Sequence, residues 1–248
     1  MSVLQQLTDR YNRTARFMPA ILLVLPLCVL AITAIPAAVT AWSKVAVLAA
    51  FCLPFVVSQV VRDRGLRAEP DLYQSWGGRP SEVMLRWRSA TAKTAIARRH
   101  QLVRTHLGMA LPDEAAEAAD PAEADDAYAV ATAALRERTR DRTRFPLVFE
   151  ENISYGFRRN AYACRFPAIV ICGLTAAATL ALARWSLVPL GWKQQAALVG
   201  FDVLAAAGWW RWLTPDTVRR SAEKYAHQLF ASLETLDTQS PQPQPEAP

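Results

Sequence analysis

The chain has 248 residues, of which 52% are hydrophobic and 20% charged, and its formal net charge is +6. These averages suit a soluble domain, but the apolar residues gather in four blocks separated by stretches rich in Arg, Glu and Asp, which excludes a simple water-soluble globule. The aromatic content of 9% and the many Leu, Val and Ala residues also exclude a wholly disordered chain. We therefore predict an all-α integral membrane protein in which two transmembrane helical hairpins flank a cytosolic helical domain.

The first hairpin is expected near the N-terminus. Residues 1–17 are predicted to form a cytosolic amphipathic segment, and residues 18–61 to form transmembrane hairpin 1 with spans from Met18 to Pro36 and from Val45 to Val61. Each span has the roughly 17 to 25 apolar residues that a helix needs to cross the hydrocarbon core. A cleaved signal peptide is the alternative for the first block, because three arginines precede an apolar run that ends in small residues.

Residues 62–166 are predicted to form the cytosolic helical domain. An irregular first part, which includes Pro70, leads to a turn at residues 77–80 and then to a basic helix over about 81–107, which Gly108 should end. An acidic stretch follows, and a second helix should begin at Pro121 with Asp120 as its N-cap. The separated charges favour each helix through its dipole, and they would also allow the two helices to pair.

The aromatic segment from Phe145 to Phe166 should lie at the lipid headgroup boundary before the second hairpin. Transmembrane hairpin 2 is expected over residues 167–213, with spans from Pro167 to Ala183 and from Ala196 to Leu213. An amphipathic helix is expected over residues 214–239. The tail over residues 240–248 alternates Pro and Gln and is predicted to be disordered.

The positive charges predict the orientation. Arginines precede the first span, border both ends of the central region and follow the fourth span, whereas the two hairpin connectors hold only Lys44, Arg184 and Lys193. Because Lys and Arg near span ends stay on the cytoplasmic side, both termini should be cytoplasmic. Ala-rich and Arg-rich usage is typical of bacteria, so we expect a multi-pass protein of the bacterial inner membrane.

Asp202 is the only acidic residue inside the four predicted spans. A carboxylate in hydrocarbon costs on the order of 3 kcal/mol, so its side chain should face protein or water. One interpretation is an ion, proton or gating site. The other is a structural residue that fixes helix contacts through Thr175, Thr179, Ser58 or Gln59.

A candidate anion-binding surface lies around Gly77, Gly78, Arg79, Arg86 and Arg88. A Gly-Gly turn exposes backbone N–H groups, a following helix N-terminus adds positive potential, and guanidinium groups bind phosphate in a bidentate manner. An anionic nucleotide or an acidic lipid headgroup would suit such a surface. A plain turn that leads into a helix explains the same residues without a ligand.

Signs of an enzyme are absent from the sequence. The cysteines and histidines show no metal-ligand spacing, and no nucleophile elbow, phosphate loop or dinucleotide-binding glycine pattern occurs. We therefore expect no catalytic residue, no metal and no cofactor. No specific nucleic acid is expected, because the net charge of the central region is small. Small residues at four-residue intervals in the third and fourth spans allow a homo-oligomer or close packing within the chain.

The order of hairpin, helical domain and hairpin resembles the four-span membrane effectors of bacterial antiphage systems that respond to nucleotide signals. The Trp76-Gly77 pair after the second span is also similar to a pair in bestrophin-like anion channels. The stretches from Leu72 to Leu85 and from Phe145 to Asn160 look like bacterial membrane proteins whose activity is not assigned.

The resemblance to effectors implies a ligand-gated or effector-type protein that permeabilises the membrane. A bestrophin-like anion channel is one alternative. The other is a non-conducting membrane scaffold that recruits a cytosolic partner through its charged helices.

Overall fold

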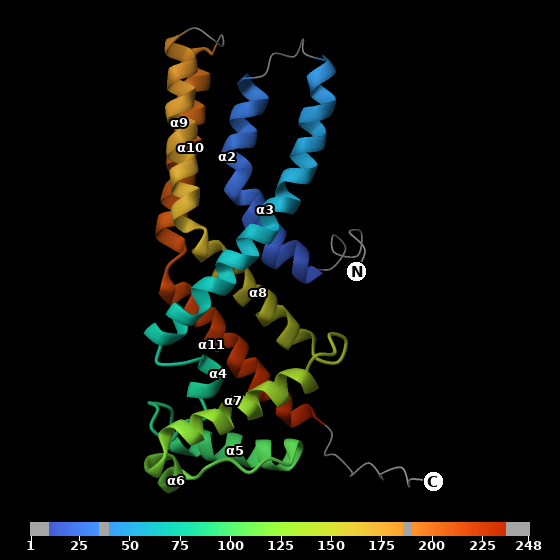
Figure 1. Cartoon of the computed structure of the whole chain (residues 1–248), viewed down its shortest axis with the longest axis vertical. Helices are drawn as coiled ribbons and strands as arrows, with labels where there is room; N and C mark the ends of the chain where they lie inside the picture. Colours follow the sequence, from blue (N-terminus) through green and yellow to red (C-terminus); the bar gives the residue numbers. More distant parts are fainter. Residues whose placement is uncertain (1–9, 35–39, 186–189, 237–248) are drawn as a thin grey trace, which may run out of the picture. The chain divides into compact units, whose positions relative to one another are not determined.

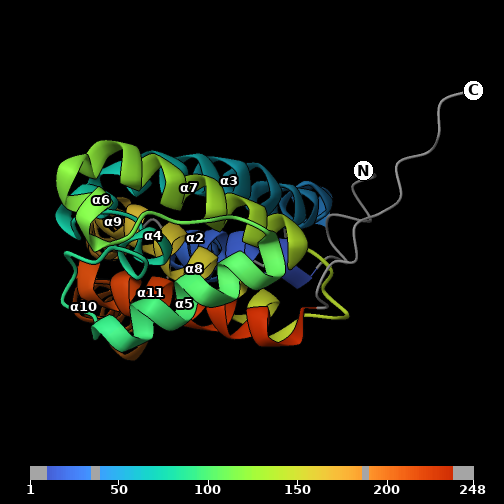
Figure 2. The same ribbon diagram turned by 90° about the horizontal axis from the view of Figure 1, so that it is seen from below.

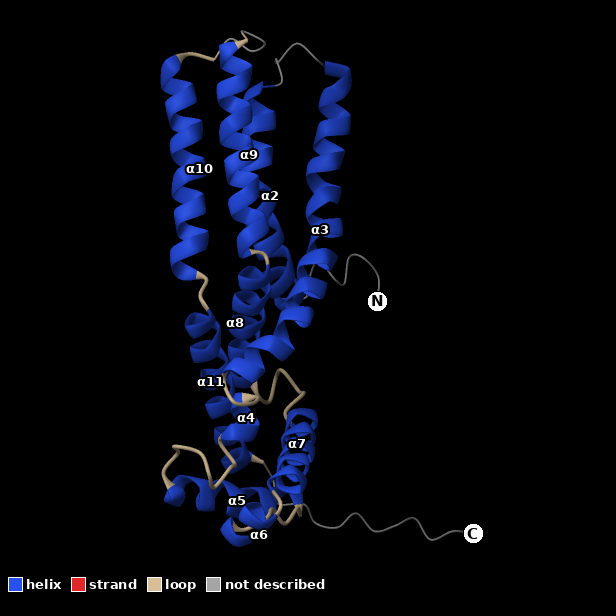
Figure 3. Cartoon of the chain, turned by 60° about the vertical axis from the view of Figure 1, so that its left-hand side comes forward, coloured by secondary structure: helices blue, strands red, loops and turns tan. Residues whose placement is uncertain are grey.

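The computed structural model describes residues 10–34, 40–185 and 190–236, and for residues 34 and 40–54 it describes the backbone alone. Within these ranges all regular structure is helical (Figure 3), which confirms the all-α prediction. In chain order the elements are η1 (Asn12–Phe17), α2 (Met18–Ala34), α3 (Thr40–Ser75), α4 (Pro80–Val83), α5 (Lys93–Leu107), α6 (Glu114–Ala119), α7 (Pro121–Arg138), α8 (Pro146–Ala163), α9 (Arg165–Arg184), α10 (Trp192–Trp212), α11 (Pro215–Ala231) and η2 (Ser232–Thr235).

The chain forms two compact units, and their limits fall inside α3, α8 and α11. Unit 1 comprises Met1–Leu72 with Ile153–Val218, and unit 2 comprises Tyr73–Asn152 with Arg219–Pro248. The predicted boundaries at residues 61, 166 and 213 separate membrane-spanning segments from cytosolic ones. The two compact units are defined by contacts within the chain, so they do not test these boundaries.

Unit 1 contains the long apolar helices. Helices α9 and α10 run side by side along their lengths, and α2 packs against α9 (Figure 1). The C-terminal end of α2 and the N-terminal end of α3 lie at the same end of this unit as the corresponding ends of α9 and α10 (Figure 1). The helices of each predicted hairpin are therefore antiparallel.

Two of these helices are long and apolar enough to cross a membrane. They are Asn12–Thr33, with a mean hydropathy of 2.3, and Arg165–Arg184, with a mean hydropathy of 2.1. Only 33% and 22% of their most apolar windows are buried, whereas the core helix of a soluble protein would be mostly buried. This combination indicates membrane association.

The other two predicted spans are not shown by the same criteria. The span from Val45 to Val61 lies in α3, but most of its side chains fall outside the described residues. The span from Ala196 to Leu213 lies almost wholly in α10, which is not among the qualifying helices. Asp202 and Arg211 lower the mean hydropathy of α10.

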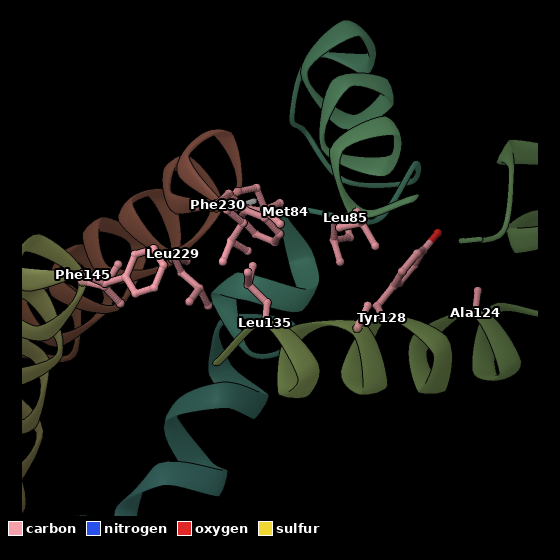
Figure 4. Packing of buried hydrophobic residues seen from close by; sticks show 14 residues of the cluster. Met84, Leu85, Ala124, Tyr128, Leu135, Phe145, Leu229 and Phe230 are labelled. Atoms are coloured by element: carbon pink, nitrogen blue, oxygen red, sulfur yellow. The ribbon is translucent and has the colours of Figure 1, made fainter. Parts of the chain in front are cut away.

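Unit 2 is built around α7. Helices α4, α5 and α6 each contact α7 (Figure 2). Tyr128 and Leu135 of α7, Leu85 after α4 and Leu229 and Phe230 of α11 are all buried in one apolar cluster (Figure 4). The apolar face of α11 therefore packs on residues of the predicted cytosolic domain.

The predicted helix over residues 81–107 is wrong in one respect, because the chain is not helical between α4 and α5. The backbone N–H groups of Trp87 and Arg88 donate to the side chain of Glu117 instead of to helix carbonyls. The carbonyls of Met84 and Leu85 are bonded by the side chains of Arg99 and His100. Hydrogen bonds to distant side chains thus replace those of a continuous helix.

The expected irregular segment after residue 62 is also wrong, since α3 continues through Pro70 to Ser75. Leu72 is buried, and Glu69 is bonded to α8, so tertiary contacts stabilise this helix beyond the proline. Both predicted helix ends are confirmed. Gly108 ends α5 with a left-handed φ of 69°, and the Asp120 carboxylate accepts from the first N–H groups of α7.

Candidate functional site

The turn between α3 and α4 brings together three of the five residues predicted to bind an anion. Gly77 and Gly78 have φ values of 78° and 136°, which favour glycine, and Arg86 donates from its Nη1 to the carbonyl oxygen of Gly77. A Cβ at Gly78 would lie 2.9 Å from the same Arg86 nitrogen. The close approach of this guanidinium explains why the second turn residue is a glycine.

Arg86 and Arg88 both face carboxylates of the same chain. Arg86 holds Asp125 through two bonds, Nε to Oδ1 at 2.7 Å and Nη2 to Oδ2 at 3.1 Å. Arg88 joins Asp125 at 2.6 Å and Glu117 at 2.9 Å. Two guanidinium groups and two carboxylates therefore form one charge-balanced network. We call these four residues the Arg86 network.

Glu117 is the buried member of the Arg86 network, with 2% of its surface exposed. It accepts from the backbone N–H groups of Trp87 at 2.8 Å and Arg88 at 3.0 Å, and from the Tyr128 hydroxyl at 2.6 Å. Burial alone would raise the pKa of Glu117, but these donors outweigh it and lower the pKa. Burial of the Tyr128 hydroxyl, together with its hydrogen bond to Glu117, raises the pKa of Tyr128.

His100 completes the aromatic side of this region. Its ring lies 5.0 Å from the Trp87 ring and 5.7 Å from the Tyr128 ring, measured between centroids. Its Nε2 lies 2.8 Å from the Leu85 carbonyl oxygen. Burial lowers the pKa of His100, which favours a neutral ring that donates to that carbonyl.

Arg79 lies apart from the Arg86 network. Its Nη1 is 3.4 Å from Glu82 Oε1 on α4, and its guanidinium carbon lies 5.1 Å from the centre of the Tyr73 ring. The structure thus groups Gly77, Gly78, Arg86 and Arg88 and gives their cations internal partners. A phosphate would have to compete with Asp125 and Glu117, so anion binding stays a prediction.

A pocket of about 290 Å³ adjoins this turn in unit 2. Trp76, Gly78 and Met84 line one part of it, and Arg219 and His227 of α11 line another. Its other lining residues are Pro80, Val83, Ser89, Ala90, Thr91 and Glu223. Arg219 is paired with Glu223 at 2.8 Å, so the pocket wall is also largely charge-balanced.

Asp202 is placed inside unit 1, as the sequence predicted for a carboxyl group in an apolar helix. Its exposed fraction is 4%, and its carboxyl group lies near the Thr175 side chain of α9, whose hydroxyl donates to the Ile171 carbonyl oxygen at 2.9 Å. Thr175 and Thr179 are themselves 2% and 1% exposed. The expected partner Ser58 is buried too, and its hydroxyl donates to the Phe55 carbonyl oxygen at 2.6 Å. Buried polar groups therefore follow the α9 face that contacts α10.

A second buried polar cluster joins α3, α8 and η1 within unit 1. Arg159 pairs with Glu69 at 2.9 Å, and Tyr155 donates to the same carboxylate at 2.8 Å. Asn160 donates to the Ala15 carbonyl oxygen at 2.7 Å. A Cβ at Gly65 would lie 2.0 Å from the Asn160 Oδ1 atom, so α3 and α8 approach closely only because residue 65 is glycine.

Sequence reasoning missed Glu117, Asp125, Tyr128 and His100 as one cluster. The available signal was the opposite charge of neighbouring segments, which also fits helix dipoles. Within the described ranges no group of three or more His, Cys, Asp or Glu side chains could hold a metal ion. The arrangement offers charge pairing, a buried carboxyl group and a small pocket.

The chain was compared with protein families, curated proteins and solved structures. No family model matches it, and neither a curated protein nor a solved structure gives a match.

Proposed function

We propose that the protein is an oligomeric four-span protein of the bacterial inner membrane in which α9 and α10 form a permeation element centred on Asp202. The observation that carries the proposal is the burial of this carboxyl group on a helix that also carries large exposed apolar side chains. Val203 and Leu204, the next residues along α10, are 59% and 75% exposed.

The cost of a carboxyl group in hydrocarbon gives this position its weight. Insertion scales put an acidic residue at a span centre at roughly 2.5 to 3.5 kcal/mol. Thr175, a polar neighbour of this carboxyl group on α9, offsets part of that cost. The Thr175 hydroxyl donates to backbone carbonyl oxygens, so the Asp202 carboxyl group keeps acceptor capacity for a proton or a cation, whereas a purely structural carboxylate uses its lone pairs within the protein.

The homo-oligomer in this proposal is supported by the small residues of α9 and α10. Among the described residues, nothing lies within 4 Å of a Cβ built at Gly173 or at Gly200. Close packing among these residues therefore does not account for either glycine. A second copy could approach these faces closely.

Unit 2 supplies the proposed ligand response. The Asp125 ion pairs are partly exposed, with 33% of the Asp125 side chain accessible, so they are weak enough to exchange. A small anionic ligand, such as a nucleotide or an acidic headgroup, could bind Arg86 and Arg88 in place of Asp125. Such an exchange would leave Asp125 without its cations and favour a rearranged network.

A non-conducting scaffold is the second candidate. The observation that favours it is that Arg86 and Arg88 already have carboxylate partners, which a domain without a ligand would need for stability. Under this proposal unit 2 recruits a cytosolic protein, and Asp202 only fixes helix contacts. We propose no catalytic activity under either candidate.

Membrane potential tests the permeation element. Bacteria would express wild-type protein, Asp202→Asn or the control Asp216→Asn at matched membrane levels, and a voltage-sensitive dye would be read. Asp216 is an exposed carboxylate in the first turn of α11, so it loses the same charge elsewhere. Depolarisation by wild type and Asp216→Asn, but not by Asp202→Asn, would support the proposal.

Two other outcomes count against it. Equal depolarisation by Asp202→Asn would remove Asp202 from the mechanism. No depolarisation by any chain, with a soluble protein co-purifying at a fixed stoichiometry, would favour the scaffold.

A further inference from the structure

The start of α9 carries a guanidinium group enclosed by aromatic rings. The Arg165 guanidinium carbon lies 4.6 Å from the centre of the Phe166 ring and 5.3 Å from those of Tyr162 and Trp210. The Phe166 and Trp210 rings also meet edge to face, with centroids 6.4 Å apart. These contacts, from α8, α9 and α10 within unit 1, hold the cation in a fixed place.

Arg165 has no carboxylate partner among the described residues, unlike Arg86, Arg88 and Arg159. Its Nη1 donates to the Leu213 carbonyl oxygen at 3.2 Å, and its buried Nε has no hydrogen-bond partner. Arg159, only six residues earlier, is neutralised by Glu69 at 2.9 Å. Arg165 therefore keeps a net positive charge and hydrogen-bonding capacity.

The surroundings of Arg165 are apolar and exposed. Phe166 and Trp210 are each 60% exposed, and Trp212 is 72% exposed. All three lie at the end of the α9 and α10 pair that is predicted to be cytoplasmic. Large aromatic side chains that stay exposed at the end of an apolar helix are typical of the membrane–water interface. The combination of such rings with an unneutralised guanidinium suits a ligand that has both an acyl chain and an anionic phosphate.

We propose that Arg165, Phe166 and Trp210 bind the headgroup phosphate of an anionic phospholipid in the cytoplasmic leaflet. The guanidinium donates to the phosphate oxygens, and the rings contact the upper acyl chain. Because no protein carboxylate balances Arg165, a lipid with a net negative charge binds more tightly than a zwitterionic one. This inference rests on the proposed membrane insertion and adds a specific lipid partner to it.

Native mass spectrometry of the full chain in detergent tests the site. Wild type, Arg165→Gln and the control Arg211→Gln would each be titrated with dioleoylphosphatidylglycerol and with dioleoylphosphatidylcholine. Arg211 is an exposed arginine at the same end of α10 and loses the same charge outside the ring cluster. We expect Arg165→Gln to weaken phosphatidylglycerol binding about fivefold, with less than a twofold change for Arg211→Gln and weak phosphatidylcholine binding by all chains.

A second variant covers the chance that Arg165→Gln disturbs folding, which circular dichroism would reveal as lost helix. Trp210→Leu keeps an apolar side chain and the arginine, and it should weaken phosphatidylglycerol binding about two- to fivefold by removing one ring. Wild-type affinity in Trp210→Leu and in a folded Arg165→Gln would overturn the proposal. An equal loss in Arg211→Gln, or displacement of the lipid by inorganic phosphate, would also overturn it.

Alkaline carbonate extraction of bacterial membranes separates this inference from the proposed function. A chain that is released into the supernatant contradicts membrane insertion itself. A chain that stays in the membrane but binds phosphatidylglycerol independently of Arg165 contradicts only the lipid site.

Discussion

The two compact units differ in the kinds of side chain that they expose. In unit 1, Leu174 and Leu204 are 63% and 75% exposed, while Asp202 and Thr179 are 4% and 1% exposed. In unit 2, Tyr128 and Leu135 are fully buried, and most of the charged side chains lie at the surface. Under the proposed membrane insertion the two units lie in different solvents, and the solvent decides which side of a helix faces inward.

The two buried carboxyl groups sharpen this comparison. Glu117 of unit 2 accepts four hydrogen bonds from three residues, so its charge is satisfied within the protein. Asp202 of unit 1 lies near Thr175, whose hydroxyl donates to the Ile171 and Cys172 carbonyl oxygens. A fully satisfied carboxylate stabilises one packing arrangement, whereas a partly satisfied one is available for exchange with a proton or an ion.

The largest expected effect comes from a charge placed on an outward apolar position of unit 1. Leu174→Arg on α9 should make membrane insertion less favourable by about 3 to 4 kcal/mol, since this position would face lipid. The matched control is Val130→Arg on α7, where the side chain is 57% exposed and should face water. The measurement is the fraction of each chain that resists carbonate extraction.

Equal extraction of Leu174→Arg and wild type would mean that the exposed face of α9 contacts water or protein. In that case the opposite burial patterns of the two units would need an explanation other than two solvents. Val130→Arg should behave like wild type, because a substitution at an exposed surface position changes stability little.

A smaller but still large effect is expected from Glu117→Gln. The amide NH₂ would face the donors that now bind the carboxylate, and Arg88 would lose a charge partner, so we expect unit 2 to lose about 3 kcal/mol. Glu114→Gln, an exposed change nearby on α6, should cost much less. Hydrogen exchange measured by mass spectrometry on residues 84–92 reads this directly, because the Trp87 and Arg88 amides bond to Glu117.

Unchanged exchange in Glu117→Gln, at the same protein concentration and detergent, would show that the Arg86 network does not hold the segment between α4 and α5. The ion pairs would then be surface contacts of little energy. Unit 2 would depend on its apolar cluster alone.

Local sequence signals predicted the parts of the fold that depend on neighbouring residues. The Asp120 cap and the Gly108 stop lie where expected, because capping involves residues within one turn. The break between α4 and α5 could not be predicted, because it depends on Glu117, about thirty residues away in the chain. The continuation of α3 past Pro70 likewise depends on contacts of Glu69 with α8.

The candidate sites show the same limit. Burial of Asp202 could be predicted, because an isolated charge in an apolar helix has few alternatives, whereas Thr175 was one of four partners that the sequence allowed. The anion-binding hypothesis grouped Arg86 and Arg88 with the Gly-Gly turn, but it could not place Asp125 beside them. Partners from distant segments decide whether a cationic surface is open to a ligand.

The smallest expected effect is a pH dependence confined to unit 2, which contains all three histidines of the chain. Burial lowers the pKa of His100 below its ordinary value of 6.5. Below about that pH the unfolded chain therefore binds a proton that the folded chain does not, and the free energy of unfolding falls as the pH falls. The lowered pKa of Glu117 has the same sign, but its contribution is lost only below about 4.5.

Between pH 7 and pH 5.5, protection of residues 84–92 against hydrogen exchange should therefore decrease, after correction for intrinsic rates, while that of residues 196–204 in unit 1 should not. His100→Gln should remove most of this decrease, because a glutamine can donate to the Leu85 carbonyl oxygen but cannot take up the proton. The exposed control His227→Gln should leave the decrease in place. If His100→Gln keeps the full pH dependence, another group in unit 2 is responsible, and the acid sensitivity of that unit does not arise from the ring buried between Trp87 and Tyr128.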